Sequence, residues 1–544
     1  MRYSGVELPD LAEALKRKGF DYVRPLPSSA ELEFIGTLKA NGQEHPCRLL
    51  VPKALDDVPT IWLTHMEARL PLLRPHLSAS GYLCYIAHGA HPFDSFSPIG
   101  QILGCIVRAE RVLSSILRGE MVEDLADEFH AHWGELFCLS DVQPNSGKRE
   151  YVFEVSKNGR SWYVLSDDKD RTDAKIKLTL GTSLELKTGL LLNRAKTASR
   201  PIPYQQDWPP KTVGELLNWQ KSLDLDCAKD IERSLTAMTR VGAKKAVFTI
   251  ESPKLTYGFS TTIPQLVRRK KKPVPVRAEL YRQKIVPLLL YRIDNEYIAE
   301  RNLPAGKTLI GMEILLVGCG TIGGYLADML VKAGAGTGGG RLVLVDKDRL
   351  GPQNIGRHRL GLDAVFFPKV HALGTELSRI SPGARIEGAF DDIKRVNPGK
   401  VSLVIDATGE QALSDWVTWK YLREAVVLTV WVEGAGLAVR GLLKDKANHA
   451  CTRCISKLPL ARQVQVFKEP TEVLLKGQGC EGLYVPFPAS VSLQAAALGM
   501  EMVQAWVDGV AAPTLRTRVL VPGRELMTPD CTPLKVEGCP VCDT

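Results

Sequence analysis

The sequence predicts an α/β protein of several domains that ends in a doubly wound parallel sheet. Its 544 residues exceed what one hydrophobic core ordinarily organises. From about residue 306 onward, short apolar strand patterns alternate with helical patterns, as βαβ units require. The earlier part has strand patterns followed by helical ones, which is typical of α+β domains. We therefore predict three domains, at 1–145, 146–305 and 306–544.

The composition favours a soluble protein of the cytoplasm. Hydrophobic residues make up 44% of the chain and charged residues 24%. No apolar run approaches the roughly 20 residues that span a bilayer, and the first residues lack the apolar core of a secretory signal. The net charge of +9 is modest, and the densest basic run, 268–272, lies between prolines, as in an exposed loop. We expect neither a membrane nor a nucleic acid as partner.

The first two domains differ in how much their sequences indicate. In the first, strand patterns at 32–40 and 46–52 precede an apolar helical pattern at 97–120. Residues 146–305 contain strand and helix patterns but no reactive constellation. We expect this second α+β domain to be a linker or docking unit.

A glycine-rich turn opens the third domain. Gly318, Gly320 and Gly323 follow a strand pattern and begin a helical one, so the backbone can approach phosphates at a helix N-terminus. Asp346 ends the next strand, where a carboxylate can hold ribose hydroxyls. These residues alone predict a nucleotide site, and a nicotinamide-dependent oxidoreductase would also have them.

The polar residues that follow favour adenylation over hydride transfer. Asp348, Asn354, Arg357 and Lys369 are clustered after the ribose carboxylate. A dehydrogenase does not need this set. An enzyme that couples a carboxylate to the α-phosphate of ATP must neutralise the triphosphate and hold Mg²⁺, which such residues can do.

With its glycine loop, DxD, NxxR and downstream Lys, the third domain resembles the ThiF/MoeB/ubiquitin-activating superfamily. The resemblance implies ATP and Mg²⁺ as cofactors, with Asp346 on the ribose and Asn354, Arg357 and Lys369 on the phosphates. It also places Asp406 near magnesium and the reacting carboxylate. This sequence departs from the family pattern in two places: His358 replaces the usual Gln, and Gly409 stands where a second Asp is frequent.

Four of the twelve cysteines form two CxxC pairs. The pairs are Cys451 with Cys454 and Cys539 with Cys542. Two intervening residues allow both sulfurs of a pair to reach one ion, so the two pairs can complete a four-thiolate zinc site. Members of the resembled superfamily often carry CxxC pairs at these two places, which implies structural Zn²⁺.

Cys480 is the first candidate nucleophile. It lies in a glycine-rich segment before a long apolar helical pattern. A thiolate there could attack an acyl-adenylate and form a thioester. In ubiquitin-activating relatives the catalytic cysteine precedes this same helix. The alternative is a free structural thiol, since some sulfur-carrier relatives do not require it.

Cys84 is the second candidate nucleophile. The segment from His76 to Cys84, followed by Ser97-Pro98 at a helix start, resembles the active-site region of ubiquitin-conjugating enzymes. The HPN triplet of those enzymes is absent, so the group that stabilises the oxyanion is open, with His76 and His88 as candidates. Cys105 lies within an apolar helical run and is expected in the core.

The whole chain resembles the bacterial fused conjugating–activating proteins (E2–E1 fusions) of CBASS anti-phage operons. This resemblance implies a homodimer formed through the adenylation domains. It also implies that the activated group is the C-terminal glycine of a cGAS-like nucleotidyltransferase. The acyl group would pass from the adenylate to Cys480, then to Cys84, and finally to a protein amine.

Three other functions fit parts of the sequence. A sulfur-carrier adenylyltransferase of MoeB/ThiF type would use the third domain without the cysteine relay. A nicotinamide-dependent oxidoreductase would bind a dinucleotide and catalyse no pyrophosphate exchange. A non-catalytic scaffold would retain nucleotide binding only.

Overall fold

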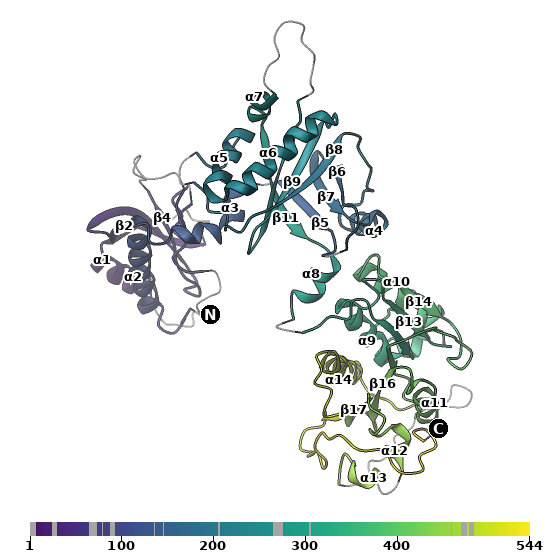
Figure 1. The fold of residues 1–544 in the computed structure, drawn as a ribbon. Coiled ribbons are helices and arrows are strands. Elements are labelled where there is room, and N and C mark those ends of the chain that lie inside the picture. Colours follow the sequence, from purple (N-terminus) through teal and green to yellow (C-terminus); the bar gives the residue numbers. More distant parts are fainter. Residues whose placement is uncertain are drawn as a thin grey trace.

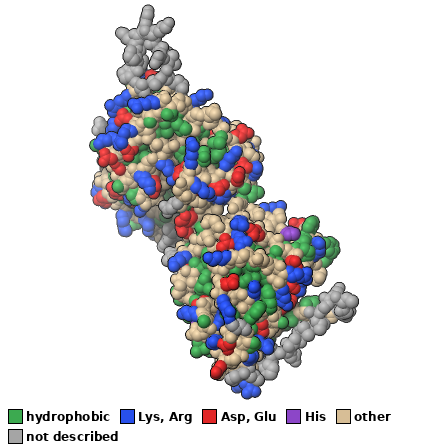
Figure 2. All heavy atoms as spheres, turned by 45° about the vertical axis from the view of Figure 1, so that its right-hand side comes forward, with side chains coloured by type: hydrophobic (Ala, Val, Ile, Leu, Met, Phe, Trp, Pro, Cys, Tyr) green, Lys and Arg blue, Asp and Glu red, His purple; other side chains and the backbone are tan. Residues whose placement is uncertain are grey.

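The computed structural model contains three units in chain order, each built on its own sheet (Figure 1). It describes residues 7–23, 30–64, 73–78, 80–87, 93–134, 136–144, 146–204, 207–264, 276–303, 306–457, 460–468, 476–477 and 484–543. Among the helices in these ranges, none is both long and apolar enough to cross a membrane. On the face shown in Figure 2, basic and acidic side chains are interspersed.

The first unit is an antiparallel sheet in the order β1-β2-β3-β4 that packs against two helices. Its elements are α1 (Leu8–Arg17), β1 (Phe20–Val23), β2 (Glu31–Ala40), β3 (Gln43–Pro52), β4 (Thr60–Leu63) and α2 (Pro98–Leu117). Asn41 and Gly42 join β2 to β3, and both have positive φ, as a twisted two-residue hairpin requires. Alternate side chains of β2, including Phe34 and Leu38, meet Leu11 of α1 in the core.

The second unit is a seven-stranded mixed sheet in the order β6-β7-β5-β11-β10-β9-β8. Its elements are η1 (Val122–Ala126), α3 (Phe129–Trp133), β5 (Leu136–Asp141), β6 (Tyr151–Lys157), β7 (Arg160–Ser166), α4 (Lys169–Leu180), β8 (Leu190–Lys196), α5 (Val213–Leu223), α6 (Leu225–Arg240), β9 (Lys245–Glu251), β10 (Thr256–Thr262), α7 (Val276–Tyr281), β11 (Ile285–Arg292) and α8 (Asn295–Glu300). Although β5 precedes residue 146, it is hydrogen-bonded between β7 and β11 in this sheet.

Buried charges lie where β5 ends, on the side of the second unit from which α8 leads to the third (Figure 1). Asp141 is fully buried and accepts from Arg171 at 3.0 Å and from Lys175 at 2.7 Å. Arg171 also pairs with Asp167. Because buried charges are costly unless paired, this network fixes α4 onto the sheet.

The third unit is a seven-stranded sheet in the order β14-β13-β12-β15-β16-β17-β18. Its elements are β12 (Glu313–Val317), α9 (Thr321–Lys332), β13 (Arg341–Val345), η2 (Pro352–Asn354), η3 (Leu362–Ala364), α10 (Lys369–Ile380), β14 (Ile386–Ala389), β15 (Leu403–Asp406), α11 (Gln411–Tyr421), β16 (Val426–Glu433), β17 (Ala438–Lys444), α12 (Thr452–Ser456), α13 (Leu460–Gln463), α14 (Ala489–Val507) and β18 (Leu515–Val519). The neighbouring strands from β14 to β16 are parallel to one another. β17 is antiparallel to both of its neighbours, β16 and β18.

Helices cover both faces of this third sheet. One core contains side chains of α9, α10 and α14, and a second core on the other face contains side chains of α11. The strand order reverses at β12, where the chain passes first to β13 and later to β15 on the opposite side. These features confirm the predicted doubly wound fold, preceded by two α+β units. Ligands of such sheets bind at the carboxyl ends of the strands beside the reversal point.

Candidate functional site

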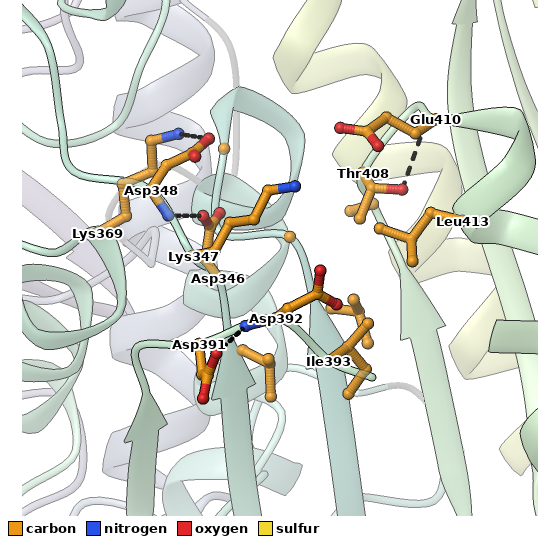
Figure 3. A pocket seen from close by; sticks show the side chains of 15 residues that line it. Asp346, Lys347, Asp348, Lys369, Asp391, Asp392, Ile393, Thr408, Glu410 and Leu413 are labelled. Carbon is orange, nitrogen blue, oxygen red and sulfur yellow. Dashed lines mark hydrogen bonds and ion pairs between the residues drawn. The ribbon is translucent and has the colours of Figure 1, made fainter. Parts of the chain in front are cut away.

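A cavity of about 130 Å³ lies at this reversal point (Figure 3). The carboxyl ends of β12, β13 and β15 contribute Gly318, Asp346 and Ala407 to its lining. The remaining lining residues are Val317, Gly320, Val345, Lys347, Asp348, Lys369, Asp391, Asp392, Ile393, Thr408, Glu410 and Leu413. Of the residues predicted to bind the nucleotide, five line this cavity: Gly318, Gly320, Asp346, Asp348 and Lys369.

The glycine turn is packed too closely for side chains at two positions. Gly318 has φ of +89°, and a Cβ there would lie 3.0 Å from the backbone of Ala407. A Cβ on Gly323 would lie 1.8 Å from the carbonyl oxygen of Gly318. Gly323 therefore does not line the cavity but lets α9 begin directly beneath it. The free N–H groups at the start of α9 then face a site suited to phosphate.

Asp346 organises the loop after β13. Its carboxylate accepts from the backbone N–H of Cys319 at 2.7 Å and of Asp348 at 2.8 Å. Burial raises the pKa of this carboxyl above its usual value, while Lys369 acts in the opposite direction. Asp346 thus links the glycine turn to the neighbouring strand end, at the position from which a ribose would be bound.

Charged side chains lie on opposite walls of the cavity. Lys369 begins α10 and pairs with Asp348 at 3.0 Å. Glu410 stands on the opposite wall, and the side chains of Lys347 and Asp392 lie between the two walls (Figure 3). Sequence reasoning missed Lys347, Asp392 and Glu410. Glu410 could have been found from the sequence, because it directly follows Gly409, the position at which the resembled family frequently has an acidic residue.

Asn354 and Arg357 are not part of the cavity lining. The Asn354 side chain accepts from the backbone N–H of Gly351 at 2.9 Å. The Arg357 guanidinium donates to the carbonyl oxygen of Val485 at 2.9 Å and lies 4.3 Å from the ring centroid of Phe487. Burial lowers the pKa of Arg357. In this structure Arg357 therefore contacts the segment that leads into α14.

Asp406 is fully buried and also lies outside the cavity lining. It ends β15, and its Oδ1 accepts from the backbone N–H and the hydroxyl of Thr408 at 3.0 and 2.7 Å. Burial raises the pKa of this carboxyl. The carboxylates that line the cavity include Asp348, Asp392 and Glu410. Such hard oxygen donors fit Mg²⁺ chemically.

The two CxxC pairs come together in the structure, as predicted. The sulfurs of Cys451, Cys454, Cys539 and Cys542 all lie within 4.8 Å of one another, and three of the separations are 3.6–3.7 Å. Four sulfurs at about 2.3 Å from one zinc ion in tetrahedral geometry are about 3.8 Å apart. The cluster therefore fits Zn²⁺, and it would tie the C-terminal segment to α12.

Cys480 and His88 lie outside the described residues. On either side of Cys480, Lys476 and Tyr484 exchange backbone hydrogen bonds of 2.9 and 2.8 Å. Tyr484 is also 5.8 Å from the Arg357 guanidinium, measured to the ring centroid. The two chain segments that flank Cys480 therefore meet each other beside Arg357.

Cys84 is half-buried in the first unit. Its backbone N–H donates to the carbonyl oxygen of His76 at 2.7 Å, and its thiol lies 3.7 Å from the carbonyl oxygen of Ile86. Burial, and secondarily the charge of Glu128, raise the pKa of the thiol. Cys105 is buried in the core on α2, as expected.

Comparison with known proteins finds family matches for the two ends of the chain. Residues 7–137 match the Prokaryotic E2 family B, and residues 298–539 match the ThiF family. The ATP-dependent ubiquitin transferase-like protein Cap2 of Pseudomonas aeruginosa (strain BWHPSA011 / Pa011) is 42% identical over 544 residues, covering 99% of this chain and 100% of the relative. The chain belongs to the Cap2 family of ATP-dependent ubiquitin transferase-like proteins.

Other relatives are more distant. A Cap2 protein of Escherichia coli (strain TW11681) is 25% identical over 519 residues, covering 87% of this chain and 86% of the relative. The solved structure of E. coli MccB with ATP aligns at 16% identity and a TM-score of 0.34, covering 43% of this chain and 68% of MccB. The family matches confirm the conjugating-like N-terminal unit and the ThiF-type C-terminal unit. Cap2 membership supports ATP-dependent activation and conjugation.

Proposed function

We propose that this chain adenylates the C-terminal carboxylate of a partner protein and passes the acyl group through two of its own cysteines to an amine. The observation that carries the proposal is the presence in one chain of two separate sites. A nucleotide-type cavity lies at the strand ends of the ThiF-type unit, and a half-buried thiol, Cys84, lies in the conjugating-like unit.

In the first step, the partner carboxylate attacks the α-phosphate of ATP and pyrophosphate leaves. The phosphates would lie on the N-terminus of α9, close to Lys369, with the ribose at Asp346. Arg357 would turn from Val485 toward the phosphates, assisted by Asn354. Magnesium, held by oxygens such as those of Asp348 and Glu410, would neutralise phosphate charge. Asp406 would act by holding Thr408 and the β15 turn in place.

In the later steps, the acyl group moves between thiols. The thiolate of Cys480 forms a C–S bond with the acyl carbon while the C–O bond to AMP breaks. The Cys84 thiolate then displaces Cys480 by the same exchange. An amine finally forms an amide and releases Cys84 as thiol. Each transfer replaces one activated acyl group by another of similar or lower energy, so ATP supplies the driving force.

The partners follow from the family resemblance. We propose that the activated protein is a cGAS-like nucleotidyltransferase in a CBASS defence operon, and that the acceptor is a protein lysine. We further propose a homodimer through the adenylation domains and a structural zinc at the four cysteines. We also propose the domain division 1–145, 146–305 and 306–544 with one change: residues 122–141 are counted in the second domain, because β5 is part of its sheet and α3 packs in its core.

The test is co-expression with the proteins encoded beside this one, followed by non-reducing gels and mass spectrometry with and without ATP. Wild type is compared with Cys84→Ala and Cys480→Ala, and with Cys531→Ser as a control, since Cys531 is another partly exposed thiol. We expect a thiol-sensitive, ATP-dependent adduct on Cys84 that is lost in Cys480→Ala and retained in the control.

Two results would contradict the relay. Pyrophosphate exchange without any thioester would favour a sulfur-carrier adenylyltransferase. No adduct and no ATP consumption, with every candidate partner present, would favour a nucleotide-binding scaffold.

A further inference from the structure

The short helix α3 is anchored in the core of the second unit. Phe129 and Trp133 are fully buried, and their rings pack against Trp219 at 6.0 and 5.5 Å and against Tyr257 at 5.1 and 5.6 Å between centroids. The Trp133 indole N–H also donates to the carbonyl oxygen of Gly258 on β10 at 2.8 Å. This aromatic packing fixes α3 rigidly on the middle unit.

The residues just before α3 hold His76 of the first unit. Glu128, which immediately precedes the helix, receives the His76 backbone N–H at 3.1 Å on one oxygen and approaches the His76 Nδ1 at 2.7 Å with the other. Asp124, on η1, lies 3.1 Å from the His76 Nε2. His132 of α3 lies 3.7 Å from the same Glu128 carboxylate. Figure 1 shows α3 on the side of the second unit that faces the first.

His76 is in turn bonded to Cys84. The His76 carbonyl oxygen accepts the Cys84 N–H, and Leu77 and Leu83 pair between them. His76 has φ of +59°, a conformation that non-glycine residues adopt only when their surroundings hold them. Glu128 holds both the ring and the backbone of His76, so it determines the orientation of the residue as well as its charge.

We infer that α3 and the turn before it couple the middle unit to the conjugating-like unit, and that Glu128 and Asp124 are positioning residues for Cys84. This inference rests on the proposed role of Cys84 as an acyl carrier. It gives the second unit a role: it provides a rigid platform from which the Cys84 loop is aligned. Because both ring nitrogens of His76 contact carboxylates, His76 acts in this alignment and does not serve as the oxyanion donor.

The experiment uses the full-length protein with Glu128→Gln and Asp124→Asn, which remove charge with little change in shape. Asp127→Asn is the matched control, because Asp127 lies on the same segment but pairs with Arg200 and Lys254 of the second unit. Three rates are measured for each variant. They are ATP–pyrophosphate exchange, single-turnover transfer to Cys84, and alkylation of Cys84 by iodoacetamide, resolved by peptide mass spectrometry.

We expect transfer to Cys84 to fall at least tenfold in Glu128→Gln, and less in Asp124→Asn, with pyrophosphate exchange unchanged. Alkylation of Cys84 should become faster in Glu128→Gln, because a carboxylate that disfavours the thiolate is gone and the loop is released. Opposite changes in these two rates distinguish positioning from a general loss of structure. Asp127→Asn should match wild type in all three rates.

Unchanged transfer and unchanged alkylation in both variants would overturn the inference. If wild type forms no ATP-dependent adduct on Cys84, the proposed function fails, and the alkylation rates still decide whether Glu128 controls the Cys84 loop. If Glu128→Gln does not fold, Asp124→Asn decides the question, because Asp124 contacts only the Nε2 side of the ring.

Discussion

Arg357 lies with its guanidinium 4.3 Å from the ring centroid of Phe487, and it donates to the carbonyl oxygen of Val485. One residue thus links the segment after η2 with the segment that leads into α14. A planar guanidinium can stack and donate at the same time, which an ammonium cannot do as well.

We therefore expect Arg357→Lys to lower ATP–pyrophosphate exchange by about 10²-fold, the order found when one charge-stabilising donor is removed from a transition state. Arg524→Lys is the matched control, because the Arg524 guanidinium also lies against an aromatic ring, 5.2 Å from the ring centroid of Phe467. Neither Arg524 nor Phe467 lines the cavity. Exchange in Arg357→Lys equal to that of the control would show that Arg357 does not act on the phosphates.

The glycine turn provides a second prediction, in which two neighbouring glycines behave differently. Gly323→Ala should destabilise the third unit and abolish ATP binding, because its Cβ would lie 1.8 Å from a backbone oxygen that cannot move independently. The expected loss is about 2–4 kcal/mol in the free energy of unfolding, which exceeds the roughly 1 kcal/mol gained in helix propensity.

Gly320→Ala is the control for folding, since a Cβ there meets nothing within 4 Å. Thermal unfolding followed by calorimetry, with and without ATP, measures both effects. Equal stability of the two variants would contradict the close packing beneath the cavity.

The four-cysteine cluster predicts one zinc ion per chain. Elemental analysis of the purified protein should find it, and Cys539→Ser should lose it. Loss of the ion should lower the melting temperature by on the order of 5–10 °C, because the C-terminal segment is no longer tied to α12. Cys531→Ser should retain the metal, and a metal content unchanged in Cys539→Ser would contradict the assignment.

The His76–Glu128 pair predicts that stability depends on pH in both directions. Hydrogen bonding to Glu128, with Asp124 adding to it, raises the pKa of His76 to about 9 from 6.5. This contribution to stability is complete below pH 6.5 and is lost as the pH rises through 9. Burial raises the pKa of Glu128, but its hydrogen bonds with His132 and His76 lower the pKa by a larger amount. The net pKa of Glu128 therefore lies below its ordinary value of 4.5. The contribution of Glu128 is therefore present above pH 4.5 and is lost in acid.

Melting curves of wild type and Glu128→Gln, compared from about pH 2 to pH 10, check this prediction. The difference in the free energy of unfolding, derived from these curves, should be largest near neutral pH, on the order of 2 kcal/mol after solvent screening, and should shrink toward both ends. Asp124, His132 and Cys84 also lie near the pair, so the Glu128→Gln comparison is needed to isolate it. A difference that is independent of pH would contradict the charged pair.

Much of the third unit was predictable from local sequence. The glycine turn, the strand carboxylate and the CxxC spacing each act over a few residues, so their geometry is determined by neighbours along the chain. The doubly wound fold follows from the alternation of strand and helix patterns. In contrast, the positions of Asn354 and Arg357 were not predictable, because their side chains choose between the cavity and the distant segments around Gly351 and Val485.

By itself, the sequence determined the fold class of the chain, the nucleotide turn, the four metal-type cysteines and the two nucleophile candidates. Only the tertiary structure decided that β5 joins the second sheet, that Asp406 is buried outside the cavity, and that Glu410 faces Lys369 across it. It alone also decided that α3 packs in the core of the second unit, while Glu128, just before α3, contacts His76 of the first unit. The physical reason is that local patterns fix where elements form and which residues share a face. The contacts between elements far apart in the chain depend on how the complete hydrophobic cores pack.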